Sequence, residues 1–292
     1  MKDGVLESLS AMDAFGVRYP LQRFPVGLYL LGQADGMPKQ LSLILAIILS
    51  TQLLWGKKDN SSNDPVLGAI VTRGRMLAEY DVAAWHATDA VQAMNPPTDN
   101  AQRFIAKKTD TGWVVVFGHL NGSRDKFLVL YEATQGSTAQ EFKAKKCDPP
   151  VEDKTFYLAA ARALDIALRD FQGEKRPYNT YVVPSETNQL YLYILPAHTT
   201  SEVYPLGGDV RYLFTADGNM ILEKHQMHKT ILEYRNSGHT IAGVHIHVLS
   251  DLPEDSDVFH VLSRNPPVPE FIVGNQKHKY SILVDGTIVR EK

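Results

Sequence analysis

The spacing of apolar and polar residues predicts two helices in the middle of the chain. Apolar residues recur at helical spacing in residues 75–94, where Asn95-Pro96-Pro97 supplies a stop. The pattern is clearest in residues 155–171, where Asp153 or Thr155 can cap the helix and Gly173 follows its end. We therefore expect one helix on each side of a region that is rich in strand-forming residues.

Strands are predicted where β-branched and aromatic residues cluster or alternate. Residues 112–118 and 126–132 lie on either side of Asn121-Gly122, which predicts a hairpin. Residues 178–183 and 189–195 follow the second helix. The second of these stretches is apolar on both sides, which is typical of a strand covered on both faces.

The C-terminal part alternates short elements. Residues 212–221 and 280–289 each place Asp-Gly five residues after a tyrosine, which predicts two hairpins. Between them we expect a strand at 239–249, a short helix at 254–263 and a buried strand at 271–273. The predicted fold class is α+β, with a mixed, mostly antiparallel sheet, flanking helices and a preceding N-terminal apolar segment.

That apolar segment is a continuous run at residues 41–55. If Met37 is the true start, the run has the basic stretch, the apolar length and the polar exit of a signal peptide. Trp55, Lys57 and Lys58 are instead typical of a membrane interface, although a full span needs roughly 20 residues. We predict an exported (periplasmic or extracellular) or membrane-anchored protein. A buried core helix is the alternative.

These patterns divide the chain into five parts. Residues 1–36 would be a misassigned upstream extension and residues 37–56 the signal peptide or membrane anchor. A linker at 57–75, a helix plus β-hairpin region at 76–150 and an α+β domain at 151–292 would follow.

Composition and charge narrow the classes of function. The formal net charge is −3, and no basic stripe is interleaved with aromatic residues, so no nucleic-acid partner is expected. Cys147 is the only cysteine, which excludes an intrachain disulfide and cysteine-rich zinc sites. Any transition-metal site must therefore use histidines and carboxylates, and no pattern points to a particular protein partner.

Histidines are concentrated near the C-terminus. Six of the ten lie between positions 225 and 260, namely His225, His228, His239, His245, His247 and His260. Residues two apart on a strand project to the same face, ~7 Å apart, so His245 and His247 can converge on one small target. Asp257 follows in the predicted short helix. These three residues are the candidate metal ligands, and zinc is the expected ion.

The order of the elements around His245-x-His247 resembles that of the JAB/MPN (JAMM) metalloproteases, over at most residues 153–289. Those enzymes carry a distant Glu and then His-x-His-Pro-x6-Ser-x-x-Asp. Their two His and the Asp bind zinc, and the Glu acts through the metal-bound water. Asp257 is the nearest counterpart of the Asp, one residue short of the family spacing. The resemblance implies a zinc-dependent hydrolase of peptide or amide bonds.

The motif is only partly present. Val248 stands where the family has Pro, and Glu254 stands where it has Ser. Glu174 and Glu186 lie near the strand that would carry the family's Glu, but neither has the family's surrounding residues. The catalytic residues of such an enzyme are therefore not assigned.

The number of protein ligands separates two kinds of metal site. Three ligands leave a fourth position for a water whose pKa falls to about 7, which suits hydrolysis. A fourth ligand, from His260 or from His225 and His228 on the neighbouring hairpin, would close the shell and make the metal structural.

A site without metal is the remaining alternative. His245 and His247 would then be polar residues of a half-buried strand, hydrogen-bonded to Asp255, Asp257 or the backbone. The protein would in that case be a non-catalytic structural or interaction module of the cell envelope.

Overall fold

The computed structural model describes residues 64–96, 103–200, 203–235, 240–276 and 278–291. Within these ranges the chain forms three helices and fourteen strands, most of them paired antiparallel, which confirms the α+β class. The predicted signal peptide or anchor at 37–56 and the extension at 1–36 lie outside the described residues. Among the helices of the described ranges, none is both long and apolar enough to cross a membrane.

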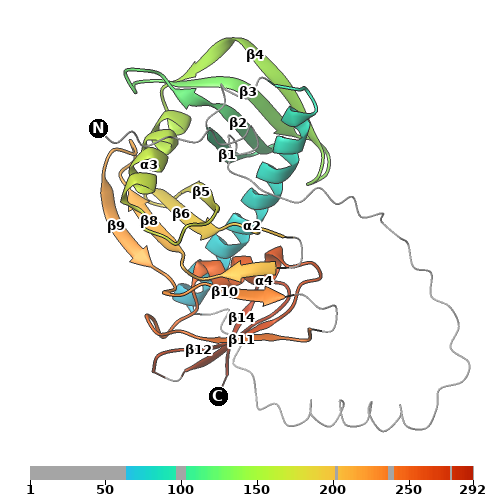
Figure 1. The fold of residues 1–292 in the computed structure, drawn as a ribbon, viewed down its shortest axis with the longest axis vertical. Helices are drawn as coiled ribbons and strands as arrows, with labels where there is room; N and C mark the ends of the chain where they lie inside the picture. The colour runs from blue at the N-terminus through green and yellow to red at the C-terminus, as the bar shows by residue number, and fades with distance from the viewer. Residues whose placement is uncertain (1–63, 97–102, 201–202, 236–239, 277, 292) are drawn as a thin grey trace, which may run out of the picture.

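Helix α2 (Pro65–Gln92) extends from a sheet formed by residues 103–153 to a sheet formed by residues 243–291 (Figure 1). It begins ten residues before the predicted start, in a stretch that we expected to be linker. The cause is local, because the Asp64 carboxylate accepts hydrogen bonds from the amides of Val66 and Leu67 at 2.9 and 3.4 Å, and proline occupies the first helical turn. Both features favour a helix start.

The first sheet is an antiparallel meander of β1 (Arg103–Thr109), β2 (Gly112–Leu120), β3 (Phe127–Gln135) and β4 (Phe142–Asp153). The predicted hairpin around Asn121-Gly122 is confirmed as β2 and β3. Strand β4 continues through residue 150, where we placed a domain boundary. The division into domains therefore stays a prediction.

The second sheet has the order β5-β6-β8-β9 and packs against helix α3 (Phe156–Asp170). Its strands are β5 (Tyr178–Pro184), β6 (Leu190–Pro196), β8 (Val210–Phe214) and β9 (Ile221–Gln226). The helix at 155–171 and the first Asp-Gly hairpin are confirmed, and β6 is buried along most of its length, as predicted. Strands β7 (Val203–Leu206) and β10 (Leu232–Arg235) pair separately as a two-stranded ribbon.

The C-terminal sheet contains β11 (Gly243–Ile246), β12 (Glu270–Val273), β13 (Lys279–Ile282) and β14 (Ile288–Glu291), in that order. Helix α4 (Asp255–Ser263) connects β11 to β12, which run parallel, and the second Asp-Gly hairpin is confirmed as β13 and β14. The strand predicted at 239–249 is shorter than expected. One face of this sheet packs against α4 and the first turns of α2 in an apolar core. This packing places α4 beside the histidine-bearing strand.

Candidate metal centre

Strand β11 reverses the usual arrangement of apolar and polar side chains. His245 and the following His247 are buried, whereas Val244 and Ile246 are 65% and 67% exposed. The alternation places both imidazoles on the inner face of the sheet, toward α4, as the period of a strand requires. A strand that buries histidines and exposes valine and isoleucine indicates that the histidines have polar partners inside.

Those partners are His228 and Asp257, which the fold brings from two other elements. His228 lies just after β9, and Asp257 lies in the first turn of α4. One ligand atom from each of the four residues lies within 4.8 Å of all the others, and all four side chains are buried. This group could hold a metal ion.

The distances define a tight cluster of nitrogen atoms. His247 Nε2 lies 3.0 Å from His228 Nε2 and 3.0 Å from His245 Nε2. Asp257 Oδ1 lies 3.1 Å from the Nε2 atoms of His228 and His245, and Asp257 Oδ2 lies 3.2 Å from His247 Nε2. Three imidazoles therefore direct the same ring nitrogen at one point.

The opposite ring nitrogen of each histidine has an acceptor. His228 Nδ1 lies 2.9 Å from Asp209 Oδ1, and His245 Nδ1 lies 2.9 Å from Glu270 Oε1. The Nδ1 of His247 lies 2.8 Å from the Leu252 carbonyl oxygen. Since these acceptors require a proton on Nδ1, the neutral form of each ring has a free lone pair on Nε2. Histidines that bind metals typically show this arrangement.

Asp257 is held in place by the start of α4. Its Oδ2 accepts a hydrogen bond of 2.7 Å from the backbone amide of Glu254, and the Glu254 side chain accepts one in return, as in a capping box. Burial would raise the pKa of the Asp257 carboxyl, but His228, His247 and His245 together lower it well below its ordinary value. The carboxylate therefore faces the ring nitrogens in its charged form.

The electrostatics of the cluster favour positive charge where the nitrogens meet. Burial disfavours the charged form of His228, but the carboxylates of Asp209 and Asp257 outweigh it and raise the pKa of this imidazole well above its usual value. Burial also opposes protonation of His245, yet Asp257 and then Glu270 raise its pKa to about 9. A bound cation would satisfy the same carboxylates that otherwise hold protons on these rings.

The other candidate histidines point elsewhere. His225 Nε2 pairs with the Glu254 carboxylate at 3.0 Å, and His260 contacts Arg264. Neither belongs to the group of converging ligand atoms. His239 lies outside the described residues. Of the proposed fourth ligands, the structure brings only His228 into the cluster, and the ligand roles themselves stay predictions.

Three other acidic residues named from the sequence, Asp255, Glu174 and Glu186, do not contact the four clustered residues through the interactions described below. Asp255 pairs with Arg73 at 2.9 Å and with Arg211 at 2.7 Å, and it receives a hydrogen bond from Tyr193. Glu174 and Glu186 are exposed. Asp255 therefore does not supply the hydrogen bond to His245 or His247 that the alternative without metal proposed.

Sequence reasoning missed Asp209 and Glu270, which orient two of the imidazoles. No sequence spacing links Asp209 to His228. Glu270 did have a signal, because a carboxylate at the start of the buried strand predicted at 271–273 must have a partner. His245 is that partner.

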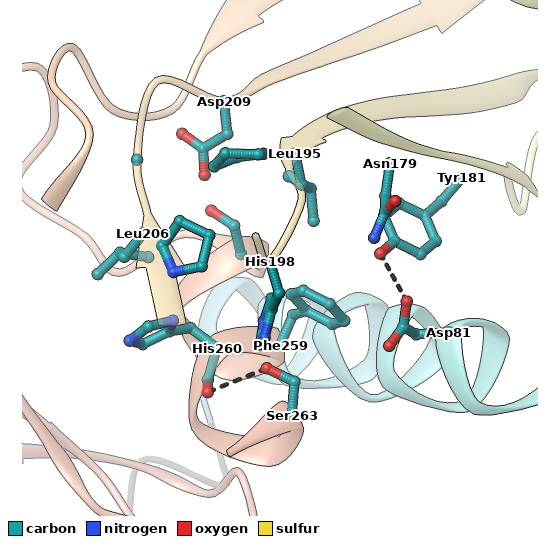
Figure 2. Close-up of a pocket in the computed structure, with 14 residues that line it drawn as sticks. Asp81, Asn179, Tyr181, Leu195, His198, Leu206, Asp209, Phe259, His260 and Ser263 are labelled. Atoms are coloured by element: carbon teal, nitrogen blue, oxygen red, sulfur yellow. Dashed lines mark hydrogen bonds between the residues drawn. The ribbon is translucent and has the colours of Figure 1, made fainter. Parts of the chain in front are cut away.

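A small cavity is lined in part by Asp209, the residue that contacts His228 of the cluster. Figure 2 shows it between the hydrogen-bonded pair of Tyr181 and Asp81 on one side and His198, His260 and Asp209 on the other. Its volume is about 20 Å³, enough for one water molecule. None of the four converging residues lines it, so it does not open directly onto the candidate metal position.

Comparison with known proteins gives no relative for this chain. No family model, no curated protein and no solved structure matches it. The class that the fold and site define is an α+β protein with a buried group of three histidines and one aspartate that could hold a metal.

Proposed function

We propose that this protein binds one zinc ion through His228, His245, His247 and Asp257, and that the ion has a structural role. The observation that carries the proposal is the convergence of three Nε2 atoms, two pairs of them 3.0 Å apart, beside a charged and buried carboxylate. In their neutral form these imidazoles direct lone pairs at one point, where a bound cation can replace the protons that the neighbouring carboxylates otherwise hold on the rings.

The donor set and its spacing suit zinc. Zinc binds imidazole nitrogen at about 2.0–2.1 Å in tetrahedral sites, so two such ligands lie ~3.3 Å apart. The spacings between His247 and the other two imidazoles and from Asp257 to each imidazole are 3.0–3.2 Å and need only a small expansion to reach that value, within a group whose ligand atoms all lie within 4.8 Å of one another. A site without thiolates also agrees with the presence of a single cysteine. Which divalent metal occupies the site would depend on the coordination geometry and on the metals available to the protein.

Four protein ligands favour a structural role. A structural zinc site is typically closed by four side chains, whereas a catalytic site keeps one position for water. His228 follows β9 of the second sheet, His245 lies on β11 with His247 just after it, and Asp257 lies on α4. An ion bound by all four would therefore join the C-terminal sheet and α4 to the second sheet.

Hydrolysis of a peptide or amide bond is the second candidate function. The observation in its favour is the position of His228, which comes from a different sheet and is the most exposed of the four at 9%. If His228 leaves the metal, His245, His247 and Asp257 give the three-ligand set that the JAB/MPN resemblance implies, with one position for water. A metal-free envelope module is the third reading, and it predicts no bound ion.

We also propose export or membrane anchoring, on the sequence pattern of residues 37–56 alone. The absence of a basic stripe supports a protein without a nucleic-acid partner. Fractionation of cells that produce the full chain, with and without residues 41–55, tests the proposed export or anchoring. An unchanged distribution of the shortened chain would contradict it.

Single substitutions of the ligands test the metal proposal. The full chain, purified without a metal-affinity tag, is expected to contain about one zinc per molecule. His228→Ala should weaken zinc binding as strongly as His245→Ala if the site is closed. Retention of zinc by His228→Ala, together with its loss from His245→Ala, would favour the three-ligand hydrolase. No zinc in the native chain, even after supplementation, would refute both metal proposals.

A further inference from the structure

Glu270 is a fully buried carboxylate that contacts three different elements. Its Oε1 atom lies 2.9 Å from His245 Nδ1 and accepts a hydrogen bond of 3.0 Å from the Tyr234 hydroxyl on β10. Its Oε2 atom lies 3.1 Å from Arg264 Nη2, at the end of α4. The guanidinium of Arg264 in turn lies over the Tyr234 ring, 4.7 Å from its centre. Glu270 is thus paired on both oxygens and fixed in orientation.

The neighbouring strand leaves space for this carboxylate. Gly243 on β11 is the register partner of Glu270 on β12. A Cβ atom on residue 243 would lie 2.6 Å from Glu270 Cδ and closer still to Oε2, well inside ordinary contact. The φ angle of Gly243 is not in the left-handed region, so the glycine is explained by space and not by backbone strain. Only a residue without a side chain lets Glu270 lie across β11 toward His245.

We propose that Glu270 is a positioning residue that sets the affinity of the metal centre, and that Gly243 is required because it makes room for it. The inference rests on the proposed zinc site. A carboxylate on Nδ1 fixes the proton on that atom, directs Nε2 at the metal and increases the basicity of the imidazole. Loss of such a partner typically weakens metal binding by 10–100-fold.

The other two histidines of the cluster are oriented by different kinds of group. His247 is oriented by the carbonyl of Leu252, a backbone group that no side-chain substitution removes. His228 is oriented by Asp209, which also accepts a hydrogen bond of 3.0 Å from the His228 backbone amide. Glu270 differs because Gly243 on the neighbouring strand β11 leaves room for its carboxylate. A substitution at Gly243 can therefore displace Glu270 without changing it.

The test is a double-mutant cycle on the zinc dissociation constant of the full chain, measured by competition with a chelator. Glu270→Ala is expected to weaken zinc binding 10–100-fold. Gly243→Ala should weaken it to a similar extent, because the new methyl group displaces the carboxylate. In the double variant the methyl group meets no carboxylate, so its loss should equal that of Glu270→Ala alone. Ile246→Ala, on the exposed face of the same strand, is the matched control and should bind zinc like the native chain.

A spectroscopic readout separates positioning from general destabilisation. Cobalt(II) bound in place of zinc should show an altered visible absorption in Glu270→Gln and Gly243→Ala, and an unaltered one in Ile246→Ala. Glu270→Gln also covers the case in which Glu270→Ala fails to fold. Native affinity in both Glu270→Gln and Gly243→Ala would overturn the inference while leaving the zinc site intact. Additive losses in the double variant would overturn the role given to Gly243, and absence of metal from the native chain would overturn both proposals.

Discussion

The contact between α2 and α4 gives a sharp prediction, because α4 carries Asp257. Gly74 is a buried residue of α2 at this contact. A Cβ atom on residue 74 would lie 2.7 Å from the Asp255 carbonyl oxygen and 2.8 Å from Val258 Cγ1. Val258 Cβ would lie closer still, and ordinary contact begins at 3.4 Å, so the helices must separate locally by more than 0.7 Å, the difference between 3.4 and 2.7 Å. Gly74→Ala should therefore displace the start of α4.

The same helix offers a matched control in Gly68. A Cβ atom there would meet no atom within 4 Å. Both substitutions gain the same helix propensity, up to about 1 kcal/mol. Only Gly74→Ala is overpacked, which typically costs about 1–3 kcal/mol. Gly68→Ala should thus be stabilising, and Gly74→Ala should be less stable than Gly68→Ala by about 1–3 kcal/mol.

Denaturant unfolding of the metal-free chains measures this difference, and chelator competition measures its effect on the site. Because Asp257 lies two residues after Asp255, displacement of α4 should also weaken zinc binding in Gly74→Ala and leave it unchanged in Gly68→Ala. Equal stabilisation by the two substitutions would refute the packing argument. Equal zinc affinity with unequal stability would refute the link between helix packing and the site.

Three further predictions concern other parts of the chain. Asp255→Ala leaves Arg73 and Arg211 without their buried counter-charge and should lower the free energy of unfolding by about 3–5 kcal/mol, measured by denaturant titration; a loss below 1 kcal/mol would contradict it. Asp64→Ala removes the cap of α2 and should cost about 1 kcal/mol, while a neutral result would show that the first turn is already frayed. Burial, together with Arg176, lowers the pKa of His198 to about 4, so the unfolded chain takes up this proton first as the pH falls. The contribution of His198 should consequently lower the free energy of unfolding by about 3 kcal/mol between pH 6.5 and 4, and an equal loss in His198→Asn would contradict this.

Local elements were predictable because their signals are local. The helix at 155–171 and the hairpins at Asn121-Gly122 and at the two Asp-Gly turns depend on short-range spacing and turn chemistry, and all of them form. The start of α2 was missed because Gly68 and Gly74 interrupt the apolar periodicity. Asp64-Pro65 was the signal that marked it.

The candidate site was predictable only in part. The shared face of His245 and His247 follows from their spacing, and the position of Asp257 on a short helix was also predicted. His228 is 17 residues before His245, and its position depends on how the second sheet packs against the C-terminal sheet. Asp209 and Glu270 likewise reach the cluster through tertiary packing. Contacts of this kind leave no periodic pattern in a single sequence.

The metal content of the full chain shows whether the cluster of three histidines and Asp257 binds zinc. The chain should be purified without a metal-affinity tag, with detergent if the apolar run requires it, and analysed by plasma mass spectrometry beside the variants. About one zinc is expected per native chain and per Ile246→Ala chain, and none in the double variant His245→Ala/His247→Ala. A native chain without zinc, or a double variant that keeps it, would show that His245 and His247 do not bind a metal ion.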